Sequence, residues 1–210
     1  MSGRDGHLSF QRMHGFSLVE LLAVIAVIAI LGVLVMGAFS GMRGGHTVSE
    51  AAAAAAGILR EAAQESVVRN AVTAVRFYQI KDPDFPSSDL AYRAMQVWRL
   101  DDNGVFQSLS RPKLLGKKAI ILAANQYSPL LATTDGVTSG TESRLGSFGT
   151  NVPYKETRFY PNRRLSIENA DTAFFTIVEE KPGTTITALP PNFAMLTIEP
   201  MNSKVRVFRP

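Results

Sequence analysis

The chain has no cysteine among its 210 residues, and this absence excludes several kinds of site. No disulfide can stabilise the fold, no thiol can act as a nucleophile, and cysteine-ligated zinc is excluded. Histidine is also scarce, because the only three are His7, His14 and His46. The sequence after residue 46 therefore has no imidazole base, which excludes a histidine-based catalytic triad there.

Charge is nearly absent over residues 16–39, where Glu20 is the only ionisable side chain. Leu, Val, Ile and Ala dominate this stretch, and as a helix it would reach about 36 Å, enough to cross a hydrocarbon core of about 30 Å. A carboxylate near the middle of a membrane costs roughly 2.5 kcal/mol or more, so its presence indicates a function. We therefore expect a transmembrane helix over residues 16–39 in which Glu20 has a specific role.

The polar segment that precedes this stretch, residues 1–15, contains Arg4 and Arg12 and ends in Gly15. An ordinary secretory signal has its cleavage site after the apolar run. Here a cut after Gly15 would precede that run and leave the whole helix on the mature chain. The order of the segments predicts a leader peptide of a different class.

The junction at Gly15 resembles the class III signal of type IV pilins and type II secretion pseudopilins. Phe16 follows the glycine and begins the apolar run, and Glu20 is the fifth residue of that run. The resemblance covers about the first 30 residues. It implies that a prepilin peptidase and methyltransferase cuts after Gly15 and N-methylates Phe16. It also implies that Glu20 attracts the amine of a neighbouring subunit's Phe16, since paired opposite charges lower each other's desolvation cost.

The same resemblance implies a structural subunit of a filament, with other pilin or pseudopilin subunits and an inner-membrane assembly platform as partners. Arg4 and Arg12 favour a cytoplasmic N-terminus and a periplasmic C-terminal domain. Many major type IV pilins have a C-terminal disulfide, so the lack of cysteine favours a minor pilin or a pseudopilin. Glu20 argues against a position at the filament tip. A plain single-pass anchor carrying a binding domain remains an alternative.

The sequence after the apolar run predicts an α+β fold, in which a long N-terminal helix packs on an antiparallel sheet. We expect the helix to continue over residues 40–71, where Ala51–Ala56 supplies strong helix formers, and a globular β domain over residues 72–210. Alternation of apolar and polar residues places Val75 and Phe77 on one face of the first strand and Arg76 and Tyr78 on the other. Strands are predicted at 72–80, 91–100, 105–109, 119–123, 158–160, 165–167, 172–179, 193–199 and 204–209.

Turns and one loop complete this prediction. Asn103-Gly104 favours a tight hairpin turn, and Pro161–Arg164 and Pro200–Ser203 are further turn candidates. Residues 132–157 are rich in Gly, Ser and Thr, and we expect a flexible surface loop there. The order of the elements resembles that of H-type minor pseudopilins. The C-terminal segment, 196–210, resembles a family of pilin-like proteins from Verrucomicrobia-type bacteria.

Chemistry-bearing clusters are few in the predicted β domain. The acidic pairs Asp82/Asp84 and Asp101/Asp102 fall in turns, where aspartate commonly bonds the local backbone. We expect Trp98 and the phenylalanines at 77, 174, 175 and 193 to belong to the core. The prediction is a non-enzymatic protein with no cofactor, no metal and no small-molecule substrate.

Basic residues near the C-terminus suggest a second hypothesis, in which a minor pilin binds incoming DNA. Lys and Arg contacts to phosphates would give affinity without sequence preference. The competing interpretation is that these residues lie on solvated edge hairpins and protect the strands from pairing with other chains. The residues concerned are Arg163, Arg164, Lys204, Arg206 and Arg209.

Overall fold

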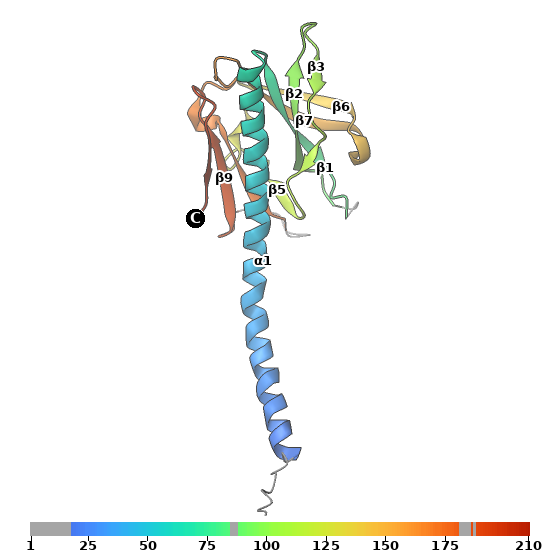
Figure 1. The fold of residues 1–210 in the computed structure, drawn as a ribbon, viewed down its shortest axis with the longest axis vertical. Coiled ribbons are helices and arrows are strands. Elements are labelled where there is room, and N and C mark those ends of the chain that lie inside the picture. Colours follow the sequence, from blue (N-terminus) through green and yellow to red (C-terminus); the bar gives the residue numbers. More distant parts are fainter. Residues whose placement is uncertain (1–17, 85–87, 181–185, 187) are drawn as a thin grey trace, which may run out of the picture. The chain divides into compact units, whose positions relative to one another are not determined.

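The computed structural model describes residues 18–84, 88–180, 186 and 188–210, with the backbone alone over 32–45. The chain divides into two compact units, Met1–Met42 and Arg43–Pro210. Helix α1, Leu18–Val68, contributes to both units (Figure 1). The predicted leader, residues 1–15, lies outside the described residues, as does Phe16.

Helix α1 ends three residues before the predicted boundary at 71. Asn70 adopts a left-handed conformation with φ +49°, and the Ala71 amide donates to the Ser66 carbonyl. This geometry is that of a helix C-cap, in which asparagine tolerates the positive φ that other residues avoid. The predicted long helix is confirmed over the described range, with its end at Val68.

The second unit contains an antiparallel sheet of ten strands with the spatial order β10-β9-β8-β5-β2-β1-β7-β6, while β3 and β4 both pair with β2. Two 3₁₀ turns, η1 (Gly146–Phe148) and η2 (Ala170–Thr172), and the short helix α2 (Pro129–Ala132) lie between strands. The predicted α+β class with an antiparallel sheet is confirmed. The strands are β1 (Thr73–Ile80), β2 (Ala91–Leu100), β3 (Phe106–Ser108), β4 (Lys113–Leu114), β5 (Ala119–Ile121), β6 (Val137–Arg144), β7 (Thr150–Phe159), β8 (Phe174–Glu179), β9 (Phe193–Ile198) and β10 (Val205–Phe208).

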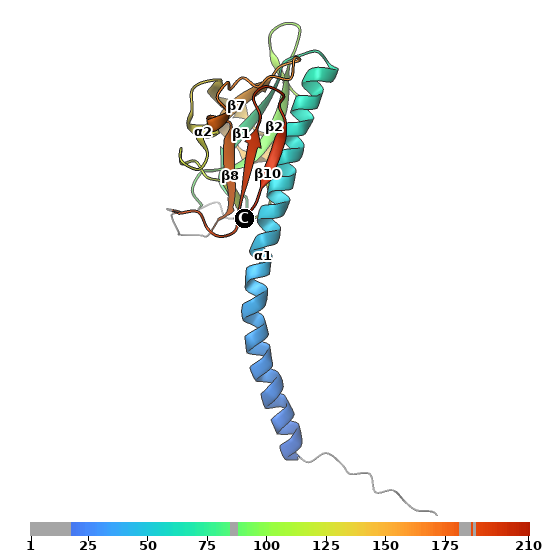
Figure 2. The same cartoon turned by 90° about the vertical axis from the view of Figure 1, so that its left-hand side faces the viewer.

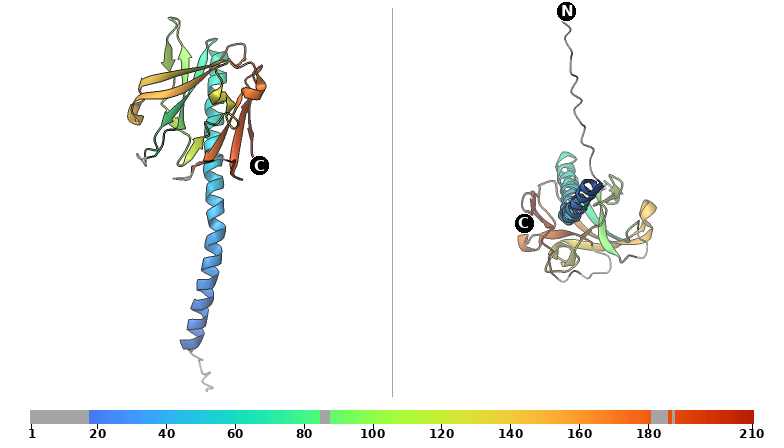
Figure 3. Two further views of the ribbon diagram at one scale, coloured as in Figure 1. Left: turned by 180° about the vertical axis from the view of Figure 1, so that it is seen from behind. Right: turned by 90° about the horizontal axis from the view of Figure 1, so that it is seen from below.

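One face of the sheet packs against the C-terminal half of α1, as Figures 2 and 3 show. Val75 and Phe77 of β1 share a buried cluster with Ala55 and Leu59 of α1, and Thr73 donates a 2.8 Å hydrogen bond to the Ala62 carbonyl. Small alanine side chains let the helix lie close to the sheet. Burial of apolar surface at this contact stabilises the fold by about 25 cal/mol per Å². The predicted alternation along the first strand is therefore confirmed.

The prediction of a flexible loop over residues 132–157 is wrong. Most of this segment forms β6, η1 and β7, and β6 pairs with β7 from Val137↔Thr157 to Arg144↔Thr150. Gly140 lies opposite Tyr154, and a Cβ at this position would come within 2.5 Å of the Tyr154 hydroxyl. A side chain at position 140 would therefore have to displace the Tyr154 ring, which packs against Tyr78. Ser and Thr are compatible with the exposed positions of this paired strand.

Other boundaries need smaller corrections. The predicted strand at 165–167 is reduced to a single bridge between Phe159 and Leu165. The first residue of the predicted strand 172–179, Thr172, belongs to η2. The hairpins on either side of residues 101–104 and 200–203 are confirmed. Of the predicted core aromatics, Phe77 and Phe175 are fully buried and 5.4 Å apart, whereas Trp98, Phe174 and Phe193 are half-buried.

The predicted membrane span at 16–39 extends beyond the residues whose side chains are described. No helix in the described part of the chain is long and apolar enough to cross a membrane.

Candidate functional site

The first candidate site is the N-terminal segment of α1. Glu20 lies in the first turn of the helix and is exposed. A carboxylate at this end is favourable, because the helix dipole places partial positive charge there. Gly15 and Phe16 lie outside the described residues, so the predicted proximity of Phe16 and Glu20 stays a prediction.

Around Glu20 the helix presents apolar side chains in every direction. Ten large aliphatic residues between 18 and 31 are 50% to 80% exposed in the isolated chain. A helix that is apolar on all sides is normally covered by lipid or by other helices, because exposed apolar patches of this extent are rare on soluble monomers. These residues are Leu18, Val19, Leu21, Leu22, Val24, Ile25, Val27, Ile28, Ile30 and Leu31.

The second candidate is a cluster of charged and aromatic side chains on the sheet face opposite α1. Arg76 Nε donates to Glu156 at 2.8 Å and its Nη1 donates to Glu142 at 2.7 Å, joining β1 to β7 and β6. The guanidinium carbon lies 3.9 Å from the ring centroid of Trp98 and 4.3 Å from that of Tyr154. Only 8% of Arg76 is exposed, so this cation is held by two carboxylates and two rings.

The electrostatics of this cluster favour its charged state. Burial alone lowers the pKa of Arg76, but the hydrogen bond and the negative charge of Glu156 more than compensate and raise it. Burial also raises the pKa of the Tyr78 phenol, which donates to Gln96 and accepts from Trp98 Nε1. Arg76, Tyr78 and Trp98 all have polar partners within the cluster, so the cluster stabilises the sheet.

Sequence reasoning missed this cluster. It placed Arg76 and Tyr78 on the same face of the first strand but treated that face as ordinary. The signal that could have found it is an arginine within an otherwise apolar strand, since a buried guanidinium requires carboxylates. A second buried cation, Arg93, donates to both carboxylate oxygens of Glu180 at 2.5 and 2.6 Å.

The predicted basic residues do not form one patch of available cations. Arg206 is paired with Glu199 at 3.4 Å, and Arg209 contacts Ser49 and Asn192 at the other end of β10. Arg163, Arg164 and Lys204 are exposed and lie in two adjacent turns, which are joined by a hydrogen bond from the Leu165 amide to the Pro200 carbonyl. The structure thus brings together three of the five.

Both acidic pairs have an aspartate that accepts hydrogen bonds from backbone amides of its own turn. Asp82 accepts the Asp84 amide at 2.9 Å, and Asp101 accepts the amides of Asn103 and Val105 at 3.0 and 2.8 Å. The Val105 hydrogen bond is the main cause of a lowered pKa at Asp101. Within the described ranges, no group of three or more His, Cys, Asp or Glu side chains could hold a metal.

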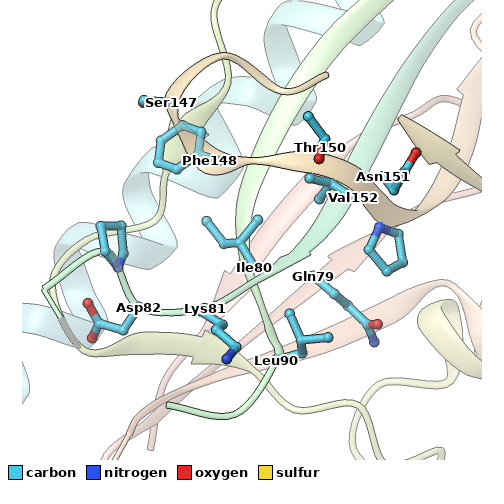
Figure 4. Close-up of a pocket in the computed structure, with 12 residues that line it drawn as sticks. Gln79, Ile80, Lys81, Asp82, Leu90, Ser147, Phe148, Thr150, Asn151 and Val152 are labelled. Carbon is cyan, nitrogen blue, oxygen red and sulfur yellow. The ribbon is translucent and has the colours of Figure 1, made fainter. Parts of the chain in front are cut away.

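A cavity of about 440 Å³ lies near the ends of β1 and β7 (Figure 4). Ile80, Phe148 and Val152 give it an apolar wall, and Lys81 and Asp82 lie at its other side. The Asp82 carboxylate already accepts a hydrogen bond from the Asp84 backbone amide. No pair of side chains in this cavity has the arrangement of a nucleophile with its base.

Comparison with known proteins bears on the N-terminal segment. A family profile described as the prokaryotic N-terminal methylation motif matches residues 11–36, which include Gly15, Phe16 and Glu20. No curated protein matches the sequence. Among solved structures, the minor pseudopilin EpsH from the type II secretion system of Vibrio cholerae is similar over 79% of this chain and 95% of its own. The identity is 10% and the TM-score 0.40.

The match identifies a prokaryotic N-terminal methylation motif, and this motif includes the beginning of helix α1. The match ends at residue 36 and does not extend into the β domain.

Proposed function

We propose that this chain is a minor pilin or pseudopilin, made as a precursor and assembled into a type IV pilus-like or type II secretion filament. The methylation motif at residues 11–36 is the single observation that carries the proposal. The exposed aliphatic surface of residues 18–31 supports it, since this surface needs a bilayer before assembly and neighbouring helices afterwards.

In this proposal the prepilin peptidase cuts after Gly15 and methylates the new amine of Phe16. The helix anchors the subunit in the inner membrane, with the leader in the cytoplasm and the β domain in the periplasm. During assembly, Glu20 attracts the amine of Phe16 on the adjacent subunit. Pairing within a low-dielectric helix bundle compensates part of the desolvation cost of both charges and sets the register between subunits.

Two alternatives make different demands. DNA uptake would require a continuous basic surface, and Arg206 and Arg209 already have partners in the protein. A plain single-pass anchor would require neither cleavage at Gly15 nor a carboxylate at position 20. Neither alternative is supported by the geometry.

Mass spectrometry of the mature N-terminus tests the proposal directly. In cells with a prepilin peptidase, we expect the chain to begin with N-methyl-Phe16. The same chain from peptidase-deficient cells should begin at the precursor N-terminus, which controls for cleavage by other proteases. An uncleaved chain in peptidase-competent cells would contradict the proposal and favour the plain anchor.

A further inference from the structure

A second cavity, of about 370 Å³, lies at the C-terminal end of α1. Val68, which lines the cavity, is 66% exposed, and Met201, next to the lining residue Asn202 in the β9–β10 turn, is equally exposed. The cavity therefore opens onto an apolar surface that the rest of the domain leaves uncovered. Its lining residues are Ala63, Gln64, Val67, Val68, Arg163, Asn202 and Ser203.

The rim of this groove is basic. Arg163 lines it, and Arg164 and Lys204 flank it in the two turns. Among the residues that the structure describes, no carboxylate lies within 4.0 Å of these three cations. The groove thus combines an apolar floor with positive charge that the domain itself does not neutralise.

Both turns contain a residue with a left-handed backbone. Arg163 has φ +66° and Ser203 has φ +56°, and the Ser203 hydroxyl donates to the Arg163 carbonyl at 2.7 Å. A left-handed backbone costs a non-glycine residue roughly 1–2 kcal/mol, which glycine would avoid. An arginine in this position supplies a positive charge that glycine would not.

A complementary surface lies at the same end of the domain. The loop between β2 and β3, residues 101–105, extends beyond the neighbouring strands near the C-terminal end of α1 (Figure 1). Asp101 accepts backbone amides within this loop, which leaves Asp102 exposed and Val105 53% exposed. The loop therefore presents one carboxylate and one apolar side chain, the counterparts of the rim and floor of the groove.

We propose that the groove at the end of α1 receives the 101–105 loop of a second copy of this chain. Asp102 of that copy pairs with Arg163 and Lys204, and its Val105 covers Val67 and Val68. Because both surfaces lie at one end of the domain, parallel neighbours present them at the same level. The contact is heterologous, so it repeats from copy to copy.

This inference rests on the proposed function, since a filament supplies the parallel arrangement of subunits. Nucleic acid is the less suitable occupant, because phosphate contacts need cations alone and leave the exposed valines and Met201 uncovered.

The absence of cysteine allows a direct test by disulfide cross-linking of the full-length chain in membranes of producing cells. Val105→Cys and Val68→Cys, on separately tagged copies, should form a mixed dimer upon oxidation by copper phenanthroline, since a disulfide needs Cα atoms about 4.4–6.8 Å apart. Val105→Cys with Ser139→Cys, on the exposed β6 strand, is the matched control and should give at least tenfold less dimer.

Charge variants then test the contact itself. Arg163→Gly removes the cation but suits the positive φ, so the fold should persist while the dimer yield falls about tenfold. Arg163→Asp on the copy that carries Val68→Cys should also abolish the dimer. When the other copy carries Asp102→Arg together with Val105→Cys, the reversed charges should pair and the dimer should return.

The outcomes separate this inference from the proposed function. N-methyl-Phe16 and filament incorporation without any cross-link would overturn the docking contact and leave the proposed function intact. A cross-link in an unprocessed chain would support the contact and contradict the proposed function. A third outcome is that no cross-link forms and that the chain binds a duplex DNA oligonucleotide, with this binding lost in Arg163→Gly. That result would overturn the inference in favour of nucleic acid.

Discussion

Arg76 Nε donates a 2.8 Å hydrogen bond to Glu156 Oε2 across the β1–β7 pair, with side chains only 9% and 2% exposed. A second carboxylate, that of Glu142 on β6, accepts from Nη1 of the same guanidinium. One buried cation therefore links three adjacent strands at the edge of the sheet. Its partners on β6 and β7 lie in the segment whose sequence predicts only a loop.

Arg76→Met should strongly destabilise the domain, because it leaves the buried Glu156 with only the more exposed Arg158 as a cation, 2.9 Å away. Removing one partner of a buried ion pair costs about 3–5 kcal/mol. Urea unfolding of the full-length chain in detergent, followed by the fluorescence of Trp98 beside Arg76, measures this loss. Arg76→Met combined with Glu156→Leu should recover much of the stability, whereas a single substitution that costs less than about 1 kcal/mol would contradict the role of the pair.

Gly136→Ala should also destabilise the protein. Gly136 has φ +67°, and a Cβ there would lie 2.1 Å from the Ser166 carbonyl oxygen, so both strain and a backbone clash oppose the change. Gly57→Ala is the matched control, since Gly57 is in α1 with no atom within 4 Å of the new Cβ. Alanine there should stabilise by roughly 0.5–1 kcal/mol, so the two variants should shift the melting temperature in opposite directions.

Glu20→Ala should be cleaved and methylated normally but assemble poorly, because in the proposed assembly this carboxylate attracts the Phe16 amine of the adjacent subunit. The measurement compares the processed chain in the membrane with the chain in sheared filaments. The control is Glu50→Ala, which should assemble normally. Glu50 is an exposed carboxylate of the same helix, in the part of α1 that belongs to the second unit. Equal incorporation of both variants would refute the assembly role of Glu20.

Asp101 should make the β2–β3 hairpin sensitive to acid. The hydrogen bond from the Val105 amide is the main cause of a lowered pKa in the folded state, so the stabilisation is fully present above the ordinary aspartate pKa. It is lost as the pH falls through the lower folded value, where the carboxylate is protonated. Hydrogen exchange at the Val105 amide, corrected for intrinsic rates, should show increased opening at low pH, and Asp101→Asn should remove this pH dependence.

The strand predictions succeeded where the signal was local. The alternation of Val75 and Phe77 with Arg76 and Tyr78 fixes the two faces of β1, and Asn103-Gly104 fixes the turn after β2. These features depend on residues that are neighbours in the chain. The β6–β7 hairpin gave no such signal, because its Gly, Ser and Thr residues are equally typical of loops.

What the sequence by itself determined is the N-terminal methylation motif. Gly15, Phe16 and Glu20 lie within six consecutive positions, and a match to this motif needs only that local order. Only the tertiary structure decided the rest: the Arg76 cluster joins residues 66 and 80 positions apart, and the groove at the end of α1 joins a helix to two distant turns. Such contacts depend on the register of strands remote in sequence, which residue patterns within one segment do not specify.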